Sequence, residues 1–190
     1  MFGPASIWHK HKLDWCGAGN FASRCYLHFT SKFVILARHI RCRPGDNARA
    51  ESDSLSVSSG RDIIVDHCSA SWSVDETLSA SSSGRLGNVT VQWCVISESL
   101  NDSIHHKGPH GYGSLVRGSF GNGYTCHHNL YAHHHARLPR PGNYNDRGRD
   151  PEGFVLDFRN NVIYNWAGRA AGYNADGYTN MEEYLNNTKP

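Results

Sequence analysis

The feature that most constrains this chain is a series of short β-branched and aromatic runs, each followed by a connection rich in Gly and Ser. The runs occupy positions 33–36, 62–68, 88–94, 124–129 and 156–161. The last four end at Cys68, Cys94, Asn129 and Asn161, which are spaced by 26, 35 and 32 residues. Spacings in this window are typical of solenoid repeats, in which each repeat forms one coil.

Equivalent side chains of stacked coils would form ladders at the ~4.8 Å separation of neighbouring strands. Asn129 and Asn161 close two successive runs, and a ladder of amides can satisfy its own polar groups inside a stack. We therefore predict an all-β chain folded as a single-stranded parallel β-helix.

Two other fold classes fit the pattern less well. An antiparallel β-sandwich would repeat its strands every ~8–12 residues with tight hairpin turns. A βαβ fold would need amphipathic helices between the strands, which the connections 79–87 and 142–153 cannot supply. One short helix is expected, ending near Leu185, because Thr179 and Asn180 each stand three residues before a glutamate.

The charge balance excludes the strongly basic face of nucleic-acid-binding domains, because 19 Lys and Arg stand against 17 Asp and Glu, a net charge of +2. No apolar run approaches the ~18–20 residues of a membrane span. Residues 8–12 interrupt any signal-peptide pattern at the N-terminus. Most of the six cysteines, which include no Cys-x-x-Cys pair, are interpreted as small buried hydrophobes. We expect a folded monomer without nucleic-acid or membrane partners.

The chain divides into three parts. Residues 1–32 show neither a helical period nor a sustained alternation, and we assign them no role. Residues 33–171 carry the repeated runs and are expected to form the β-helix. Residues 172–190 contain a loop rich in Gly and Asn and the predicted short helix.

Four segments of the chain resemble the pectate lyase family, and they occur in that family's order. They are 53–56 (DSLS), 66–76 (DHCSASWSVDE), 127–131 (HHNLY) and 137–140 (RLPR). The resemblance runs from about residue 33 to residue 176. It implies a secreted, right-handed parallel β-helix that cleaves α-1,4-polygalacturonate (pectate) by calcium-assisted β-elimination.

The resemblance also implies a catalytic base. In β-elimination a base removes the proton on the carbon next to the uronate carboxylate, and the site stabilises the charge that develops there. Arg137 matches the Arg of the family's Arg-x-Pro motif, which acts as this base. A guanidinium with a pKa above ~12 is almost wholly protonated at neutral pH. Calcium and neighbouring cations must therefore favour its neutral form.

By the same resemblance, Asp53 and Asp75 are expected to bind calcium, which prefers hard oxygen ligands. The position four beyond Asp75, usually acidic in the family, is Ser79, and Glu76 is the candidate that compensates. Lys107, with His110 as its competitor, is expected to bind substrate.

Arg140 is a further candidate for gripping a substrate carboxylate in bidentate fashion. It lies near the second Arg of the family's motif, although Pro141 and Gly142 alter the usual spacing.

The sequence offers two other candidate metal sites. Residues 172–183 fit an EF-hand calcium loop, with Gly172 in place of the first Asp and with Asn174, Asp176 and Glu183 as remaining ligands. A zinc site would use the clustered histidines at 105–106, 127–128 and 133–135. Adjacent histidines on a strand point to opposite faces, which disfavours zinc.

Several alternatives in function stay open. A Ser hydrolase is disfavoured because no Gly-x-Ser-x-Gly elbow occurs. Asp53 and Asp75 can mimic the acid and base of an inverting polygalacturonase. The chain can also be a truncated, non-catalytic β-helix that binds acidic polysaccharide, or a calcium-independent pectin lyase.

Overall fold

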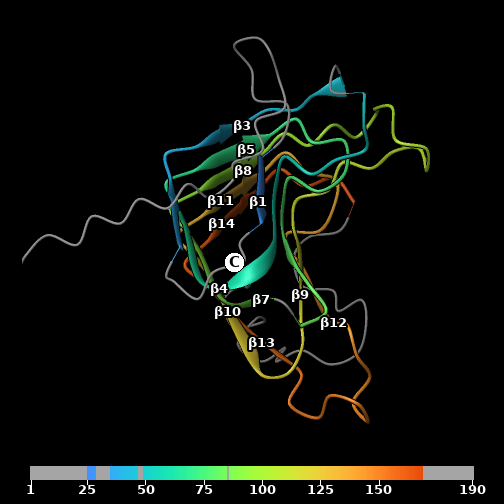
Figure 1. The fold of residues 1–190 in the computed structure, drawn as a ribbon. Helices are drawn as coiled ribbons and strands as arrows, with labels where there is room; N and C mark the ends of the chain where they lie inside the picture. The colour runs from blue at the N-terminus through green and yellow to red at the C-terminus, as the bar shows by residue number, and fades with distance from the viewer. Residues whose placement is uncertain (1–24, 29–34, 47–48, 85, 169–190) are drawn as a thin grey trace, which may run out of the picture.

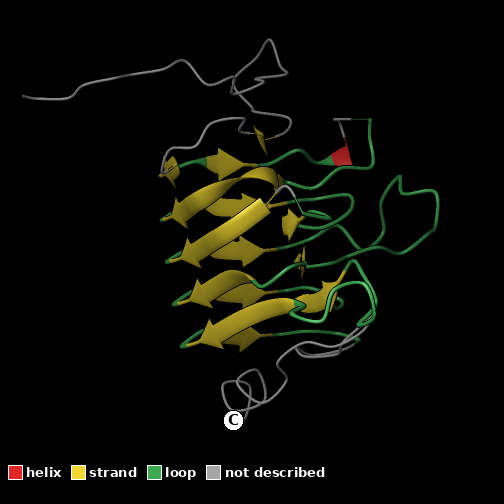
Figure 2. Cartoon of the chain, turned by 60° about the horizontal axis from the view of Figure 1, so that its bottom comes forward, coloured by secondary structure: helices red, strands yellow, loops and turns green. Residues whose placement is uncertain are grey.

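The computed structural model describes residues 25–28, 35–46, 49–84, 86–168 of the chain. Its strands are short and pair only in parallel, and Figures 1 and 2 show them stacked in successive coils. Each complete coil contributes one stretch of strand to each of three sheets. The prediction of an all-β parallel β-helix is therefore confirmed.

The strands of the three sheets follow one another around each coil. The first sheet contains β1 (Cys25–His28), the first part of β4 (Leu55–Asp66), β6 (Leu78–Ser81), β9 (Leu115–Gly118) and β12 (Arg140–Asn143). The second contains β2 (Ile35–Arg38), the second part of β4, β7 (Leu86–Gln92), β10 (Asn122–His127) and β13 (Phe154–Arg159). The third contains β3 (Arg41–Cys42), β5 (Ser69–Ser71), β8 (Val95–Ser97), β11 (Leu130–Ala132) and β14 (Val162–Tyr164).

The interior is built from rows of apolar side chains that run through all the coils. Alternate residues of a strand point inward, and the parallel register places inward residues of successive coils directly beside one another. One such row is Ile35, Ile63, Val89, Tyr124 and Leu156, and the next is Ala37, Val65, Val91, Cys126 and Phe158. Burial of each large side chain contributes about 1.5–3 kcal/mol.

The predicted ladder lies at the corner between the second and third sheets. The backbone N–H of Cys94 donates to Oδ1 of Asn129 at 2.9 Å, and the N–H of Asn129 donates to Oδ1 of Asn161 at 2.9 Å. The side chain of Asn129 also donates to the carbonyl of Val91. The corner thus satisfies buried backbone groups from coil to coil, with the spacings expected from the sequence.

The sequence reasoning missed the strands of the first sheet. β6 and β12 lie within connections that read as loops, because their Ser, Gly and Pro residues carry little β-propensity. β1 lies in the N-terminal segment to which no role was assigned, and it pairs with Leu55 to Ser59. The predicted helix near Leu185 lies outside the described residues.

Four of the six cysteines are buried in the described part of the chain, as expected. Cys68, Cys94 and Cys126 are free thiols, whereas Cys42 is disulfide-bonded. Among the described residues, no helix is long and apolar enough to cross a membrane.

Candidate active site

Three acidic side chains from two neighbouring coils meet at the edge of the first sheet. Asp53 precedes β4 by two residues, and Asp75 and Glu76 come just before β6. Each of the three offers one carboxylate oxygen, and these oxygens all lie within 4.8 Å of one another. The backbone N–H of Glu76 donates to Oδ1 of Asp53 at 3.2 Å, which fixes the two coils against each other.

The next two coils bring Arg137 to this acidic cluster. Isolated parallel bridges pair Glu76 with Tyr112, and Tyr112 with Ala136, so Arg137 follows directly after the bridged row. The Arg137 guanidinium forms an ion pair with Glu76 and lies over the Tyr112 ring, with its central carbon 3.9 Å from the ring centroid. The guanidinium is mostly buried, with 14% of the side chain exposed.

The electrostatics of the cluster are those of crowded carboxylates. Burial, followed by the repulsion of Asp75, raises the pKa of Asp53 to about 7. Three groups lower the pKa of Asp53 and partly oppose this shift: the hydroxyls of Ser79 and Ser56 and the positive charge of Arg137. Such carboxylates hold excess negative charge close together, which a divalent cation would relieve.

His110 binds the outer side of the same cluster. Its Nε2 lies 3.1 Å from Oδ1 of Asp75, and its ring stacks on His105 with centroids 3.8 Å apart and planes 5° apart. Burial lowers the pKa of His110, opposed by the Asp75 carboxylate and aided by His105 and Lys107. The imidazole of His110 therefore lies against the Asp75 carboxylate and limits where that carboxylate can turn.

The other predicted substrate-binding residues lie in different surroundings. Lys107 is exposed in the loop before His110, and its backbone N–H donates to Nδ1 of His105 at 3.1 Å. Arg140 starts β12 and lies opposite Leu115, in the outward-facing row that also contains Ser79. Arg140 thus shares a sheet with the cluster but stands two coils away from Asp75.

The second predicted calcium loop falls outside the part of the chain that the structure describes. Its residues are Asn174, Asp176 and Glu183.

The sequence reasoning did not single out Tyr112, and it considered His105 only among the clustered histidines of a disfavoured zinc site. Tyr112 supports the guanidinium of Arg137, and His105 supports the imidazole of His110. Both belong to the excursion between β8 and β9, whose sequence shows no period that could align it with the neighbouring coils. Their positions became apparent only from the bridges that pair Tyr112 with Glu76 and Ala136.

The donor set of the cluster fits calcium. Asp53, Asp75 and Glu76 supply hard carboxylate oxygens. In the described structure, Oγ of Ser79 is buried and forms no hydrogen bond of ordinary geometry, although it is close enough to lower the pKa of Asp53. A buried oxygen of this kind is a ready additional ligand.

The neighbouring imidazoles fit a softer metal less well. Asp75, His105 and His110 also converge within 4.8 Å. Nδ1 of His105, however, accepts the backbone N–H of Lys107 at 3.1 Å, so the neutral ring carries its proton on Nε2. His105 then offers no free lone pair to a metal.

The chain is similar to curated proteins of several fungi. It is 33% identical over 158 residues to "Probable pectate lyase C" of Aspergillus terreus, an alignment covering 83% of this chain and 32% of that protein. Proteins of the same name from Aspergillus flavus and Emericella nidulans are also 33% identical, over 78% and 76% of this chain. The chain spans about a third of the length of these relatives. No family model matches it.

Proposed function

The chain is related to the pectate lyase family over about four-fifths of its length, and from this premise we propose that it carries the catalytic centre of a polysaccharide lyase. The substrate is polygalacturonate, and the reaction is calcium-assisted β-elimination with Arg137 as the base. The observation that carries the proposal is the ion pair between Arg137 and Glu76, which joins the Arg-x-Pro segment to the acidic cluster from two coils away.

Asp53, Asp75, Glu76 and the Ser79 hydroxyl would hold the calcium ion. When bound, calcium supplies the positive charge that neutralises a substrate carboxylate and stabilises the enolate-like intermediate. The chain's own residues orient the reaction. His110 holds Asp75, and the Tyr112 ring fixes the plane of the guanidinium.

Arg137 would take the proton from the carbon next to the uronate carboxylate. A carboxylate in contact with a guanidinium favours the charged, protonated form of that guanidinium. Glu76 therefore opposes proton abstraction by Arg137 as long as Glu76 and Arg137 are paired. Engagement of Glu76 by a cation would weaken that pairing. The same residue thus links metal binding to the state of the base.

The spacing of the carboxylates favours the lyase over an inverting polygalacturonase. Inverting glycosidases need acid and base about 6.5–9.5 Å apart to admit a water molecule. The oxygens of Asp53, Asp75 and Glu76 lie within 4.8 Å of one another, which suits a shared cation better.

The test is the growth of near-ultraviolet absorbance from unsaturated product when the folded 190-residue chain acts on demethylated pectin. We expect absorbance to rise in calcium and to stop when a chelator is added. Equal rates on methylated pectin with chelator present would identify a calcium-independent pectin lyase instead. Binding of the polymer without any rise in absorbance would favour the truncated, non-catalytic β-helix.

Ser79→Asp is expected to tighten calcium binding by at least about tenfold, because ligand charge tunes calcium affinity over several decades. Without calcium, the added charge should lower the thermal midpoint, since it faces Asp53. Calorimetric titration and thermal melts with and without calcium measure both effects.

The matched control is Ser81→Asp, two residues further along β6, where the hydroxyl pairs with Tyr144. This variant should bind calcium as the original chain does. Weaker calcium binding in Ser79→Asp would refute the assignment of position 79 to the proposed calcium site.

We further propose that the protein acts outside the cell, as the resemblance implies. A disulfide at Cys42 supports this, because such bonds persist mainly in oxidising compartments.

A further inference from the structure

A row of exposed rings follows the corner between the second and third sheets, away from the acidic cluster. Each coil contributes the residue that comes directly after its strand in the second sheet. The rings are those of His39, His67, Trp93 and His128, which we call the ring strip; Asn160 holds the same position in the last coil.

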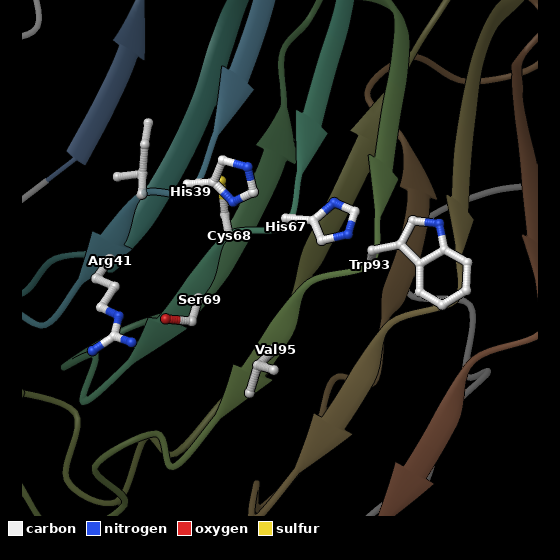
Figure 3. Close-up of a pocket in the computed structure, with 8 residues that line it drawn as sticks. His39, Arg41, His67, Cys68, Ser69, Trp93 and Val95 are labelled. Carbon is white, nitrogen blue, oxygen red and sulfur yellow. The ribbon is translucent and has the colours of Figure 1, made fainter.

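The rings of the strip follow one another along the axis of the β-helix, and those of Trp93 and His128 stack with centroids 4.4 Å apart and planes 22° apart. Figure 3 shows His39, His67 and Trp93 side by side, with their ring faces turned toward the viewer. The centroids are 5.6 Å apart between His39 and His67, and 6.2 Å apart between His67 and Trp93. The planes of His67 and Trp93 differ by only 21°. Trp93 remains 52% exposed beside the stacked His128 ring, so apolar surface of the indole is open to a ligand.

One histidine of the strip, His67, is held in place by its neighbours on the second sheet. Nδ1 of His67 lies 2.7 Å from Oδ1 of the buried Asp66, which also pairs with Arg38 and accepts the side-chain N–H of Gln92. These contacts orient the ring before any ligand arrives, which reduces the entropy that binding must overcome.

Every residue of the strip has a left-handed backbone, with φ of 56° at His39, 50° at His67, 52° at Trp93 and 55° at His128. Asn tolerates this region readily, and Asn160 occupies it in the last coil with φ of 53°. A bulky residue there is a backbone outlier. The surrounding coils impose this conformation at the corner, since such backbone strain persists only where the neighbouring structure over-determines it. The corner therefore keeps an indole where an amide would fit with less strain.

A shallow pocket of about 380 Å³ opens between the strip and the third sheet. Arg41 is the charged residue of its lining, which also contains Ser69, Val95 and three rings of the strip. No carboxylate lines this pocket in the part of the chain that the structure describes. Its charge and hydroxyl suit an anionic ligand with hydrogen-bonding groups.

We propose that the ring strip and its pocket bind a chain of acidic sugars, as a second saccharide site separate from the acidic cluster. A pyranose ring has a flat apolar face that can lie on an aromatic ring, and a uronate carboxylate can pair with Arg41. One ring per coil suits a ligand that repeats along one direction. The small net charge of the chain, +2, disfavours nucleic acid as the occupant. The choice of polygalacturonate as ligand rests on the proposed function.

The test measures binding of polygalacturonate to the full chain carrying Arg137→Ala, with chelator present, so that turnover and calcium-dependent binding are suppressed. Adding Trp93→Asn should weaken binding about tenfold and abolish the quenching of tryptophan fluorescence by the polymer. Arg41→Gln should weaken binding of polygalacturonate but not of a fully methylated polymer. The matched control is Trp166→Asn. Trp166 is similarly exposed, at 47%, but it follows the C-terminal end of β14, whereas the strip lies before the N-terminal ends of the third-sheet strands.

Unchanged affinity in Trp93→Asn, or an equal loss in Trp166→Asn, would overturn the second site. So would binding of single-stranded nucleic acid in place of polygalacturonate. The outcome is separable from that of the proposed function. If the chain forms unsaturated product and Trp93→Asn binds polymer normally, only the proposal of the second site is refuted. If the chain binds polymer through Trp93 but forms no product, only the proposed lyase activity is refuted.

Discussion

Arg137→Ala is expected to lower the rate of β-elimination by about 10²–10⁴-fold, which is the usual contribution of a positioned general base. The substrate should still bind, because the carboxylates proposed to hold calcium remain in place. The measurement is the initial rate of near-ultraviolet absorbance on polygalacturonate at saturating calcium. The loss should therefore fall on kcat, with a small change in KM.

Arg137→Lys separates the base from a purely structural role. A lysine amine loses its proton more readily than a guanidinium, so a base at position 137 should shift the pH profile to lower pH while the rate stays between those of the Ala variant and the original chain. A guanidinium that served only to bind Glu76 would give a lysine variant with an unchanged pH profile.

The matched control for the arginine is Arg43→Ala. Arg43 also lies against an aromatic ring, 5.9 Å from the centroid of Trp72, but it follows β3 of the third sheet and hydrogen-bonds Ser69. Its loss should leave turnover unchanged. Full turnover in a folded Arg137→Ala variant would refute the assignment of the base.

The fold could be predicted from the sequence because a β-helix repeats its geometry in every coil. Cys94, Asn129 and Asn161 are each linked to the neighbouring coil by a hydrogen bond at the predicted spacing. The first sheet could not be predicted in this way, since its strands β6 and β12 contain no β-branched or aromatic residue. Their pairing is imposed by the coils above and below rather than by their own propensity.

The site was predictable only where a motif carried it. Asp53, Asp75, Glu76 and Arg137 come from segments of the sequence that resemble known motifs, and the structure brings them together. Tyr112 and His105 come from an excursion of irregular length. Their contacts depend on three-dimensional register, which the sequence of a single coil does not contain.

Acid should destabilise the fold through His134, a buried imidazole. His134 is 2% exposed, and burial lowers its pKa to about 4. Its Nε2 lies 2.9 Å from the carbonyl of Ile96, which can only accept, so Nε2 carries the proton. Nδ1 then accepts from the hydroxyl of Ser99 at 2.8 Å. Both ring nitrogens are thus satisfied by the neutral form, whereas a second proton would place a charge in this buried site and force the Ser99 hydroxyl to turn from donor to acceptor.

The direction of the effect follows from the two states of His134. In the unfolded chain the imidazole has a pKa of about 6.5, whereas in the fold its pKa is about 4. As the pH falls through this window, the unfolded state binds a proton that the folded state does not. The stability that is fully present above pH ~6.5 is therefore lost progressively down to pH ~4. At 1.36 kcal/mol per pKa unit the loss amounts to about 3 kcal/mol.

Urea unfolding of the original chain and of His134→Gln between pH 7 and pH 4 measures this contribution. Glutamine keeps one donor and one acceptor but does not titrate, so the variant should be less stable at pH 7 and should approach the original chain by about 3 kcal/mol at pH 4. The carboxylates of the acidic cluster titrate in both proteins and cancel in the difference. The exposed His39→Gln serves as control and should run parallel to the original chain. Parallel curves for His134→Gln as well would mean that the buried imidazole is not the acid-sensitive group.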